Sequence, residues 1–448
     1  MKNVKTKKHF FIFNFLLLII ISGELMSSSL PKYFTQTLDN GLQIVVIPMH
    51  NNSSVVSTNI FYKVGSRNEV MGKSGIAHML EHLNFKSTKN LKAGEFDEIV
   101  KGFGGVNNAS TSFDYTNYYI KSSSKNMDKS LGLFSDLLQN LNLKDEEFQP
   151  ERDVVMEERH WRTDNNPMGY LQFRLFNNVF MYHPYHWTPI GFINDIKNWT
   201  ISDIKEFHKT YYQAKNAIIV VAGDITKEEV FESAKKHFAS IKNKHDLPSK
   251  IHTIEPKQDG AKRAIIYKNS SVEMLTIAYH IPNFEHKDQV ALSALSELFS
   301  SGKSSILQKI LVDEKKLVNQ VYAYNMELKD PGVFMFVAVC NEGVKAKDVE
   351  KEILKIIKDV KNGKVTKKEI EKIRINTRAD FIFSLESSSS VASLYGSYFV
   401  RDNIKPLFSY EDDINKITKE DLIKVANTYL NKNNSTTLIL KNDKNTKE

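Results

Sequence analysis

Hydrophobic and polar positions along the first half of the chain predict strands and helices in turn. Alternating positions and short apolar runs predict strands at Gly41–Pro48, Val55–Val64, Gly105–Ser112, Tyr115–Ser122 and Asn216–Ala222. Apolar residues three and four positions apart predict a helix beginning near Ser74 and others at Glu95–Lys101, Met127–Leu141, Phe148–Asn165, Met168–Phe180 and Ile201–Tyr212. Strand pairs followed by consecutive helices indicate an α+β fold, with a mostly antiparallel sheet packed against helices.

The second half repeats this order of elements. The pattern predicts strands at Met274–Ile281, Asn319–Met326 and Val333–Val339, a helix at Lys287–Phe299, and long helices of which one is capped by Thr366 with Glu369. Two segments, beginning at Thr200 and Thr418, share a Thr-x-x-Asp cap, an amphipathic helix ending in Thr-Tyr, and an apolar strand. We therefore predict two homologous domains, residues 29–242 and 261–448, joined by a polar linker over residues 243–260.

Composition fits two globular domains. The chain has 448 residues, of which 41% are hydrophobic and 25% are charged. Its formal net charge of +8 falls to about +5 without the first 28 residues, and no arginine-rich run is present, so we predict no nucleic-acid partner. The single cysteine, Cys340, lies in the apolar run VFMFVAVC and is predicted to be a buried strand residue without a disulfide.

The first 28 residues predict a secretory signal peptide. A basic head precedes an apolar run from Phe10 to Ile21, and small residues follow. This run is short for a membrane-spanning helix. We expect export to the periplasm, either with the leader removed or with the leader kept as an N-terminal anchor; a buried N-terminal helix is the alternative.

The segment GIAHMLEHLNFKST, residues 75–88, predicts a metal site. On a helix, His78 and His82 share one face and can reach a single ion, with Glu81 beside them. A catalytic zinc site has three protein ligands and one open position. Glu81 lies too near the histidines to complete the ligand set comfortably, but it is well placed to accept a proton from water. A third ligand must come from another segment.

The segment ERDVVMEERHWR, which begins at Glu151, is the best source of that ligand. On a helix, Glu151, Val154, Val155 and Glu158 form one stripe, and the two valines indicate that the stripe is buried. Buried carboxylates are costly without a cation or hydrogen bonds. We predict that Glu158 is the third ligand and that Glu151 orients a histidine.

Two alternatives compete with this assignment. Glu151 and Glu158 could be ordinary ion-pair partners of Arg152 and Arg159. His160 could replace Glu158 as the ligand, whereas Glu157 is expected to face solvent.

These motifs resemble the pitrilysin/insulinase family of metallopeptidases. HMLEH matches the inverted zinc motif, and Glu158 of ERDVVMEE follows His82 by 76 residues. Within the family, the chain is similar to the bacterial branch that resembles the mitochondrial processing peptidase β subunit, over essentially the whole mature chain. The resemblance implies one zinc ion per chain, held by His78, His82 and Glu158, with Glu81 as the catalytic base of peptide-bond hydrolysis.

The resemblance also assigns two other segments. GGVNNASTSFDYTNYYI, from Gly104, is similar to the family's sheet segment beside the zinc. It implies that Asn108 and Ala109 line an edge strand to which an extended peptide substrate adds by backbone pairing; a plain hairpin strand is the alternative. HPYHWTPIG, from His183, is also similar to the family, and we interpret its histidines as structural.

The second half lacks a copy of the site. At the repeat offset, His78 and His82 correspond to Ser296 and Ser300, and Glu158 corresponds to Asn376. We therefore predict a single zinc ion per chain.

The second half also departs from the family at its substrate-binding pair. Family members often place an arginine and a tyrosine there, seven residues apart, to hold substrate and stabilise the developing oxyanion. The corresponding positions here are Val312 and Asn319, although Tyr322 or Tyr324 could substitute. The resemblance therefore implies a homologous partner subunit that supplies the pair, or a homodimer.

Together, these features predict an exported zinc metalloendopeptidase that cuts short or extended peptides. The alternative is a non-catalytic scaffold subunit of the same fold in a heteromeric complex. The complete ligand set with Glu81 favours the enzyme, because a scaffold does not need a base beside three ligands. A structural zinc domain fits less well, since such sites favour four ligands and cysteine.

Overall fold

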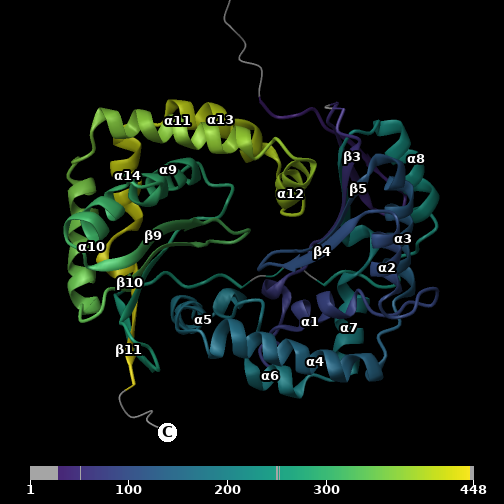
Figure 1. Ribbon diagram of the computed structural model, residues 1–448, viewed down its shortest axis with the longest axis horizontal. Helices are drawn as coiled ribbons and strands as arrows, with labels where there is room; N and C mark the ends of the chain where they lie inside the picture. The colour runs from purple at the N-terminus through teal and green to yellow at the C-terminus, as the bar shows by residue number, and fades with distance from the viewer. Residues whose placement is uncertain (1–28, 51, 249–250, 252, 444–448) are drawn as a thin grey trace, which may run out of the picture.

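Two sheets, one in each half of the chain, organise the fold (Figure 1). The computed structural model describes residues 29–50, 52–248, 251 and 253–443, so the predicted signal peptide over residues 1–28 lies outside the described residues. The first sheet has the strand order β1 (Phe34–Thr37), β2 (Gln43–Pro48), β6 (Ala217–Gly223), β3 (Val55–Tyr62), β5 (Thr116–Ser123), β4 (Val106–Thr111). The second has the order β7 (Lys262–Lys268), β11 (Ser435–Asn442), β8 (Met274–His280), β10 (Val333–Cys340), β9 (Val318–Met326).

The two sheets have the same topology apart from β1. In each sheet one pair is parallel, β2 with β6 and β7 with β11, and the other pairs are antiparallel. The strands β6 and β11 each follow a helix, α7 (Ile201–Tyr211) and α14 (Lys419–Tyr429), that begins with the predicted Thr-x-x-Asp capping box. The predicted fold class, two homologous α+β domains with mostly antiparallel sheets, is confirmed.

The remaining helices pack on the sheets or on one another. In the first half they are α1 (Ile76–Leu83), α2 (Glu95–Gly102), α3 (Met127–Asn140), α4 (Asp145–Arg159), α5 (Pro167–Val179), α6 (Ile193–Asn198) and α8 (Lys227–Phe238). In the second half they are α9 (Gln289–Ser300), α10 (Ala346–Lys361), α11 (Lys367–Phe383), α12 (Ser388–Phe399) and α13 (Lys405–Lys416). The helix predicted over Phe148–Asn165 ends at Arg159, where a π-helical turn, His160–Asp164, follows. None of the helices in the described part of the chain is long and apolar enough to cross a membrane.

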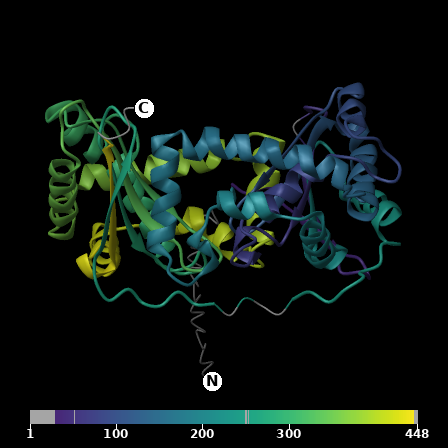
Figure 2. The ribbon, with the colours of Figure 1, turned by 90° about the horizontal axis from the view of Figure 1, so that it is seen from below.

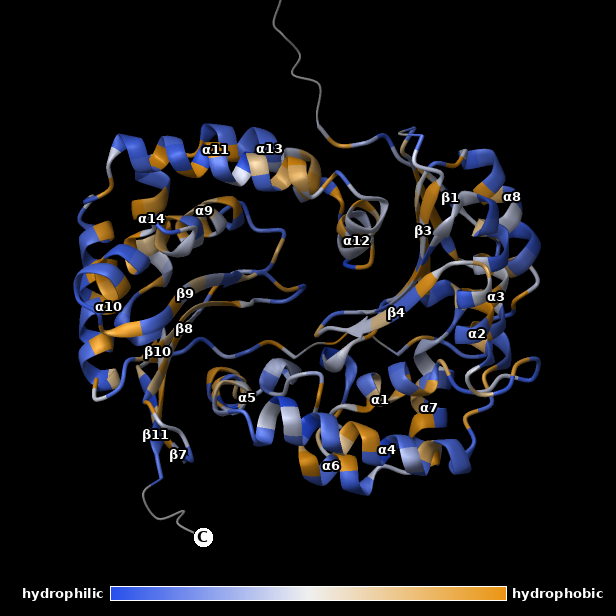
Figure 3. Cartoon of the chain, viewed as in Figure 1, coloured by the Kyte–Doolittle hydropathy of each residue, from blue (hydrophilic) through white to orange (hydrophobic). Residues whose placement is uncertain are grey.

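Each half lends one helix to the sheet of the other half. Helix α5, from the first half, packs on β8 and β11, and α12, from the second half, packs on β3 and β6. The apolar contacts are between Leu171 and Leu175 of α5 and the second sheet, and between Ala392 and Tyr395 of α12 and the first sheet. Gly396 permits the close approach of α12, because a Cβ atom there would overlap the ring of Phe61. Figure 3 shows the hydrophobic residues along the strands that these helices cover.

The exchange follows from the composition of the strands. Strand β6, AIIVVAG, is buried along its whole length and carries apolar side chains on both faces. One face packs on the helices of its own half, and the other needs a second apolar layer, which α12 supplies.

The chain crosses between the halves as an extended segment, visible along the lower side in Figure 2. The described residues of the predicted linker, 243–260, contain no helix or strand. Ionic contacts also join the halves, because the Nη2 of Arg67 lies 2.5 Å from the Oδ2 of Asp330 and the Nε2 of His183 lies 3.0 Å from the same oxygen. The histidine at position 183 is thus structural, as predicted. Cys340 is fully buried on β10, which confirms its predicted position.

Candidate metal centre

Helix α1 is fixed at its start by a buried acid. Gly75, at φ 85°, lies immediately before the helix, in a conformation that glycine adopts readily. The carboxylate of Glu69 accepts hydrogen bonds from the backbone N–H groups of Gly75 and Ala77, both at 2.8 Å, and from the Nε1 of Trp187 at 2.7 Å. Burial nevertheless raises the pKa of Glu69 to about 8. This cap sets the direction of the helix that carries HMLEH.

The two histidines of α1 lie on the face turned away from the core. The opposite face of the helix is buried, through Ile76, Ala77, Met79, Leu80 and Leu83. The imidazole rings of His78 and His82 are 4.7 Å apart, at an angle of 82°. A single helical turn therefore presents both rings side by side, as the four-residue spacing predicts.

Helix α4 brings Glu158 to these rings. Its Oε2 atom lies 3.5 Å from the Nε2 of His78 and 3.3 Å from the Nε2 of His82. One donor atom from each of the three residues lies within 4.8 Å of the others, and among the described residues they form the one such group. Two imidazole nitrogens and one carboxylate oxygen fit zinc, with room for a further ligand.

Glu151 holds one of the histidines in position. Its Oε1 lies 2.8 Å from the Nδ1 of His82, so the Nε2 of that ring turns toward Glu158. Its Oε2 lies 2.5 Å from the Nζ of Lys86. Although burial opposes the shift, the hydrogen bonds to His82 and Lys86 lower the pKa of Glu151 below its usual value. The structure thus brings Glu151 to the place predicted for an orienting acid.

Arg152 and Arg159 are not the ion-pair partners of the two glutamates, so this alternative is wrong in its partners. Arg152 donates to the Oε1 of Gln149 at 2.7 Å, and Arg159 donates to the Oδ1 of Asp164 at 3.2 Å. Neither arginine forms a described ion pair with Glu151 or Glu158. The partner of Glu158 is instead Arg162, whose Nη1 lies 2.9 Å from its Oε1.

The prediction that both valines of the Glu158 stripe are buried is only partly confirmed. Val155 is buried, but Val154 is 50% exposed, because α4 turns that position to solvent. Glu157 is exposed, as predicted. His160 lies in the π-helical turn, 3.4 Å from Asp164, and is not part of the donor group, so the structure does not support it as a ligand.

Glu81 lies beside the donors without joining them. The hydroxyl of Thr111, on β4, donates a hydrogen bond to its Oε2. Burial raises the pKa of Glu81 above its usual value, while Thr111 and the neighbouring His82 oppose the shift. A raised pKa suits a carboxylate that accepts and returns a proton. The sequence did not single out Thr111, and the alternation of residues 105–112 is the signal that could have placed it beside α1.

The donors open into a cavity of about 660 Å³. Asn108 and Ala109 line it together with Thr111, and all three belong to β4, which is an edge strand of the first sheet. The predicted edge strand is therefore present beside the donors. Tyr322 and Tyr324 are not among the described residues that line the cavity.

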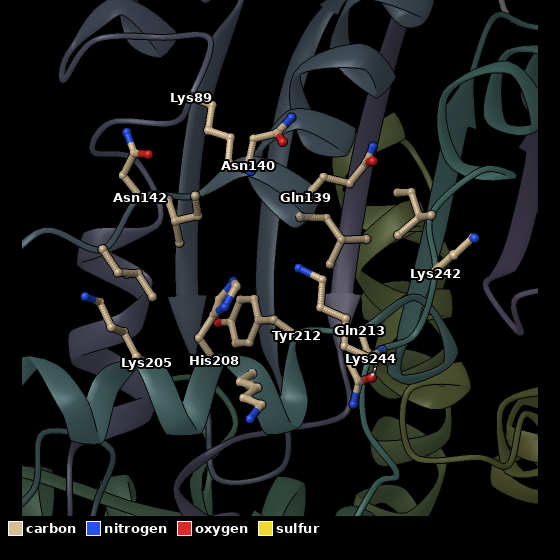
Figure 4. A pocket seen from close by; sticks show the side chains of 15 residues that line it. Lys89, Gln139, Asn140, Asn142, Lys205, His208, Tyr212, Gln213, Lys242 and Lys244 are labelled. Carbon is tan, nitrogen blue, oxygen red and sulfur yellow. Dashed lines mark hydrogen bonds between the residues drawn. The ribbon is translucent and has the colours of Figure 1, made fainter.

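A second hollow, shown in Figure 4, lies elsewhere in the first half. It measures about 420 Å³ and is lined by five exposed lysines and by His208, Tyr212 and neighbouring amides. Burial lowers the pKa of His208 to about 4. No carboxylate lines this hollow among the described residues, so none is present there to hold a cation together with His208.

The second half has other side chains at the corresponding places. Ser296 and Ser300 lie on α9, and Asn376 lies on α11, which packs against α9. Val312 lies in a π-helical segment, Gln308–Glu314, and Asn319 lies on β9.

Comparisons with known proteins cover both halves. Residues 44–182 match the family described as Insulinase (Peptidase family M16), and residues 198–377 match the Peptidase M16 inactive domain. Zinc protease PqqE of Helicobacter pylori is 53% identical over 444 residues, which is 98% of this chain and 100% of that protein. A probable mitochondrial-processing peptidase subunit beta of Arabidopsis thaliana is 26% identical over 90% of this chain and 77% of its own length. The crystal structure of a protease from Helicobacter pylori matches with a TM-score of 0.90 at 55% identity, covering 92% of this chain and 100% of that one.

Proposed function

Because the chain belongs to the insulinase family, peptidase family M16, we propose that it is an exported zinc metalloendopeptidase that hydrolyses short or extended peptides. One observation carries the proposal: donor atoms of His78, His82 and Glu158 lie within 4.8 Å of one another, beside the carboxylate of Glu81. The names of relatives such as Zinc protease PqqE support the metal and the reaction class.

Three side chains of this protein would hold the ion. They are His78 and His82 through Nε2, and Glu158 through Oε2, with Glu151 keeping the ring of His82 in place. A bound zinc ion supplies Lewis acidity to the attacking water and to the peptide carbonyl.

Glu81 carries the proton. Its carboxylate accepts the proton that the attacking water loses, and returns it to the amine that leaves as the peptide bond breaks. The place of Glu81 beside the donor group, and outside it, favours this exchange.

The peptide substrate is proposed to pair with β4. The outer edge of this strand has no neighbouring strand in the sheet, and its exposed and half-buried residues alternate strictly. An extended peptide added there lies along Asn108 and Ala109, in the cavity that holds the donors.

The central experiment combines metal analysis with peptide cleavage. Purified wild type is expected to contain about one zinc ion per chain and to cleave members of a quenched peptide library. Glu158→Gln should lose both properties, whereas Glu157→Gln, a matched change at the exposed neighbour, should keep both. Wild-type protein that binds zinc without cleaving any peptide would instead favour the non-catalytic scaffold.

We also propose a homologous partner subunit that supplies an arginine–tyrosine pair, or a homodimer. The support is the family resemblance, which implies an arginine–tyrosine pair at the positions that Val312 and Asn319 occupy in this chain. Size-exclusion chromatography with activity assays tests the idea. Full activity of an isolated monomer would contradict it.

Export to the periplasm, with the leader removed or kept as an anchor, is proposed from the first 28 residues. Cell fractionation with N-terminal sequencing of the mature protein tests it. A cytoplasmic protein that still begins at Met1 would contradict export.

A further inference from the structure

The Glu81 carboxylate is held from the side of the sheet. Among the described residues, the Thr111 hydroxyl is the side-chain donor to this carboxylate, through Oε2. The other oxygen, Oε1, accepts no hydrogen bond from the described residues and so is free to receive a proton. Tyr118 and Tyr212 also lie near Glu81, but their hydroxyls bond to each other at 2.8 Å.

The position of Thr111 follows from the alternation of β4. Asn107, Ala109 and Thr111 are half-buried on one face of the strand, while the residues between them are exposed. That half-buried face lies against α1, which packs on β4. Thr111 is the last residue of β4, which is also the open edge of the sheet. The strand that can pair with a peptide therefore also places the Thr111 hydroxyl beside α1.

The hairpin after Thr111 is firmly fixed. The backbone N–H of Ser66 donates to the carbonyl of Ser112 at 3.2 Å, and the backbone N–H of Arg67 donates to the carbonyl of Phe113 at 2.9 Å. The backbone N–H of Lys329, from the second half, donates to the Oδ2 of Asp114 at 2.8 Å. One end of β4 is therefore held by both halves of the molecule, and this end carries the hydroxyl that bonds Glu81.

We propose that Thr111 is a positioning residue that couples the substrate-binding edge of β4 to the carboxylate of Glu81. The inference rests on the proposed peptidase function and deepens it. By holding Oε2, Thr111 keeps Oε1 as the proton-accepting oxygen of Glu81. Because one fixed strand carries both the substrate-binding edge and this hydroxyl, a peptide paired with β4 is aligned with the base.

The test removes the hydroxyl and keeps the side-chain shape. Thr111→Val should lower kcat by about 10- to 100-fold, which is the effect of losing one hydrogen bond to a charged group. Peptide KM and zinc content should stay at wild-type values, because the zinc donors and the backbone of β4 are unchanged. Thr111→Ser restores the hydroxyl and should recover most of the rate. Thr35→Val, the same change on the opposite edge strand β1, should have no effect.

A crystal structure of each zinc-loaded protein gives a readout that does not depend on activity. The Glu81 carboxylate should shift from its wild-type position in Thr111→Val and return to it in Thr111→Ser. An unmoved carboxylate, an unchanged kcat, or a loss of zinc in Thr111→Val would each overturn the proposal. Wild-type protein without peptidase activity would instead overturn the proposed function, while the position of Glu81 would still test the role of Thr111.

Discussion

Helix α1 of the first half and helix α9 of the second lie against corresponding edge strands, β4 and β9. The two helices differ in the side chains that they carry at corresponding positions. At an offset of 218 residues, the two histidines of α1 correspond to Ser296 and Ser300. Glu81 corresponds to Phe299, which is fully buried and packs against Phe334 and Phe336. The fold therefore provides the place for a site, and side chains decide whether chemistry can occur there.

The supporting acids differ in the same way. Glu151 corresponds at this offset to Glu369, but Glu369 accepts hydrogen bonds from the backbone N–H and the hydroxyl of Thr366 and so caps α11. An identical residue type holds a histidine ring in one half and begins a helix in the other. Substitutions at Glu81, at Glu151 and at the contact between the halves test this contrast.

The largest effect is expected at Glu81. Glu81→Gln keeps the size of the side chain but removes its ability to accept a proton, so kcat should fall by about 10²- to 10⁴-fold. Zinc content should stay near that of wild type, since Glu81 is not in the donor group. Stopped-flow or fluorescence assays beside metal analysis measure both. Near-normal cleavage with zinc retained would remove Glu81 from the mechanism.

A smaller effect is expected at the orienting acid. Glu151→Gln weakens the hydrogen bond that holds the Nδ1 of His82, and zinc affinity should fall by about 10- to 100-fold. The matched change Glu369→Gln should leave zinc affinity unchanged, because that side chain acts only at the cap of α11. Competition with a chromogenic chelator measures the affinities. Equal losses in the two variants would show a general effect of destabilisation.

The smallest effect on activity is expected at the contact between the halves, where the change acts on the stability of the fold. Asp330→Ala leaves Arg67 and His183 without their shared carboxylate and should lower the free energy of unfolding by about 1–3 kcal/mol. Asp402→Ala, at a more exposed carboxylate that pairs with Lys63 and Lys329, should cost less than about 1 kcal/mol. Chemical denaturation at neutral pH measures both values.

The contribution of Asp330 should depend on pH in one direction. Burial opposes the shift, but hydrogen bonds and charge from His183 and Arg67 lower the pKa of Asp330 below its usual value of 3.8. The carboxylate therefore stabilises the fold fully above about pH 4, and the contribution is lost as the pH falls through the lower folded-state pKa. The difference in stability between wild type and Asp330→Ala should shrink over this acid range. A constant difference would contradict the assignment.

Local patterns in the sequence predicted most of the elements and the donor group. His78 and His82 follow from helical spacing alone, and β4 follows from its alternation. The stripe that points to Glu158 requires a buried Val154, yet Val154 is half exposed, so this part of the prediction is wrong. Helix α8 was not predicted, although the capping box of Thr226 with Glu229 signals its start.

Long-range contacts could not be predicted from such patterns. The bond between Thr111 and Glu81 joins residues 30 positions apart, and that between Arg67 and Asp330 joins residues 263 positions apart. Each depends on how sheets and helices pack, and a periodic pattern reports only which face of an element is apolar. The exchange of α5 and α12 between the halves also depends on this packing and could not be predicted from periodicity.

That exchange makes the two halves one cooperative unit. A fragment ending at the linker would leave in water the apolar face of β3 and β6 that α12 covers, and its α5 would lack the second sheet on which it packs. Such a fragment would be less stable and would also expose a hydrophobic surface that promotes aggregation. Two separately stable domains would require each sheet to acquire an apolar covering from its own half.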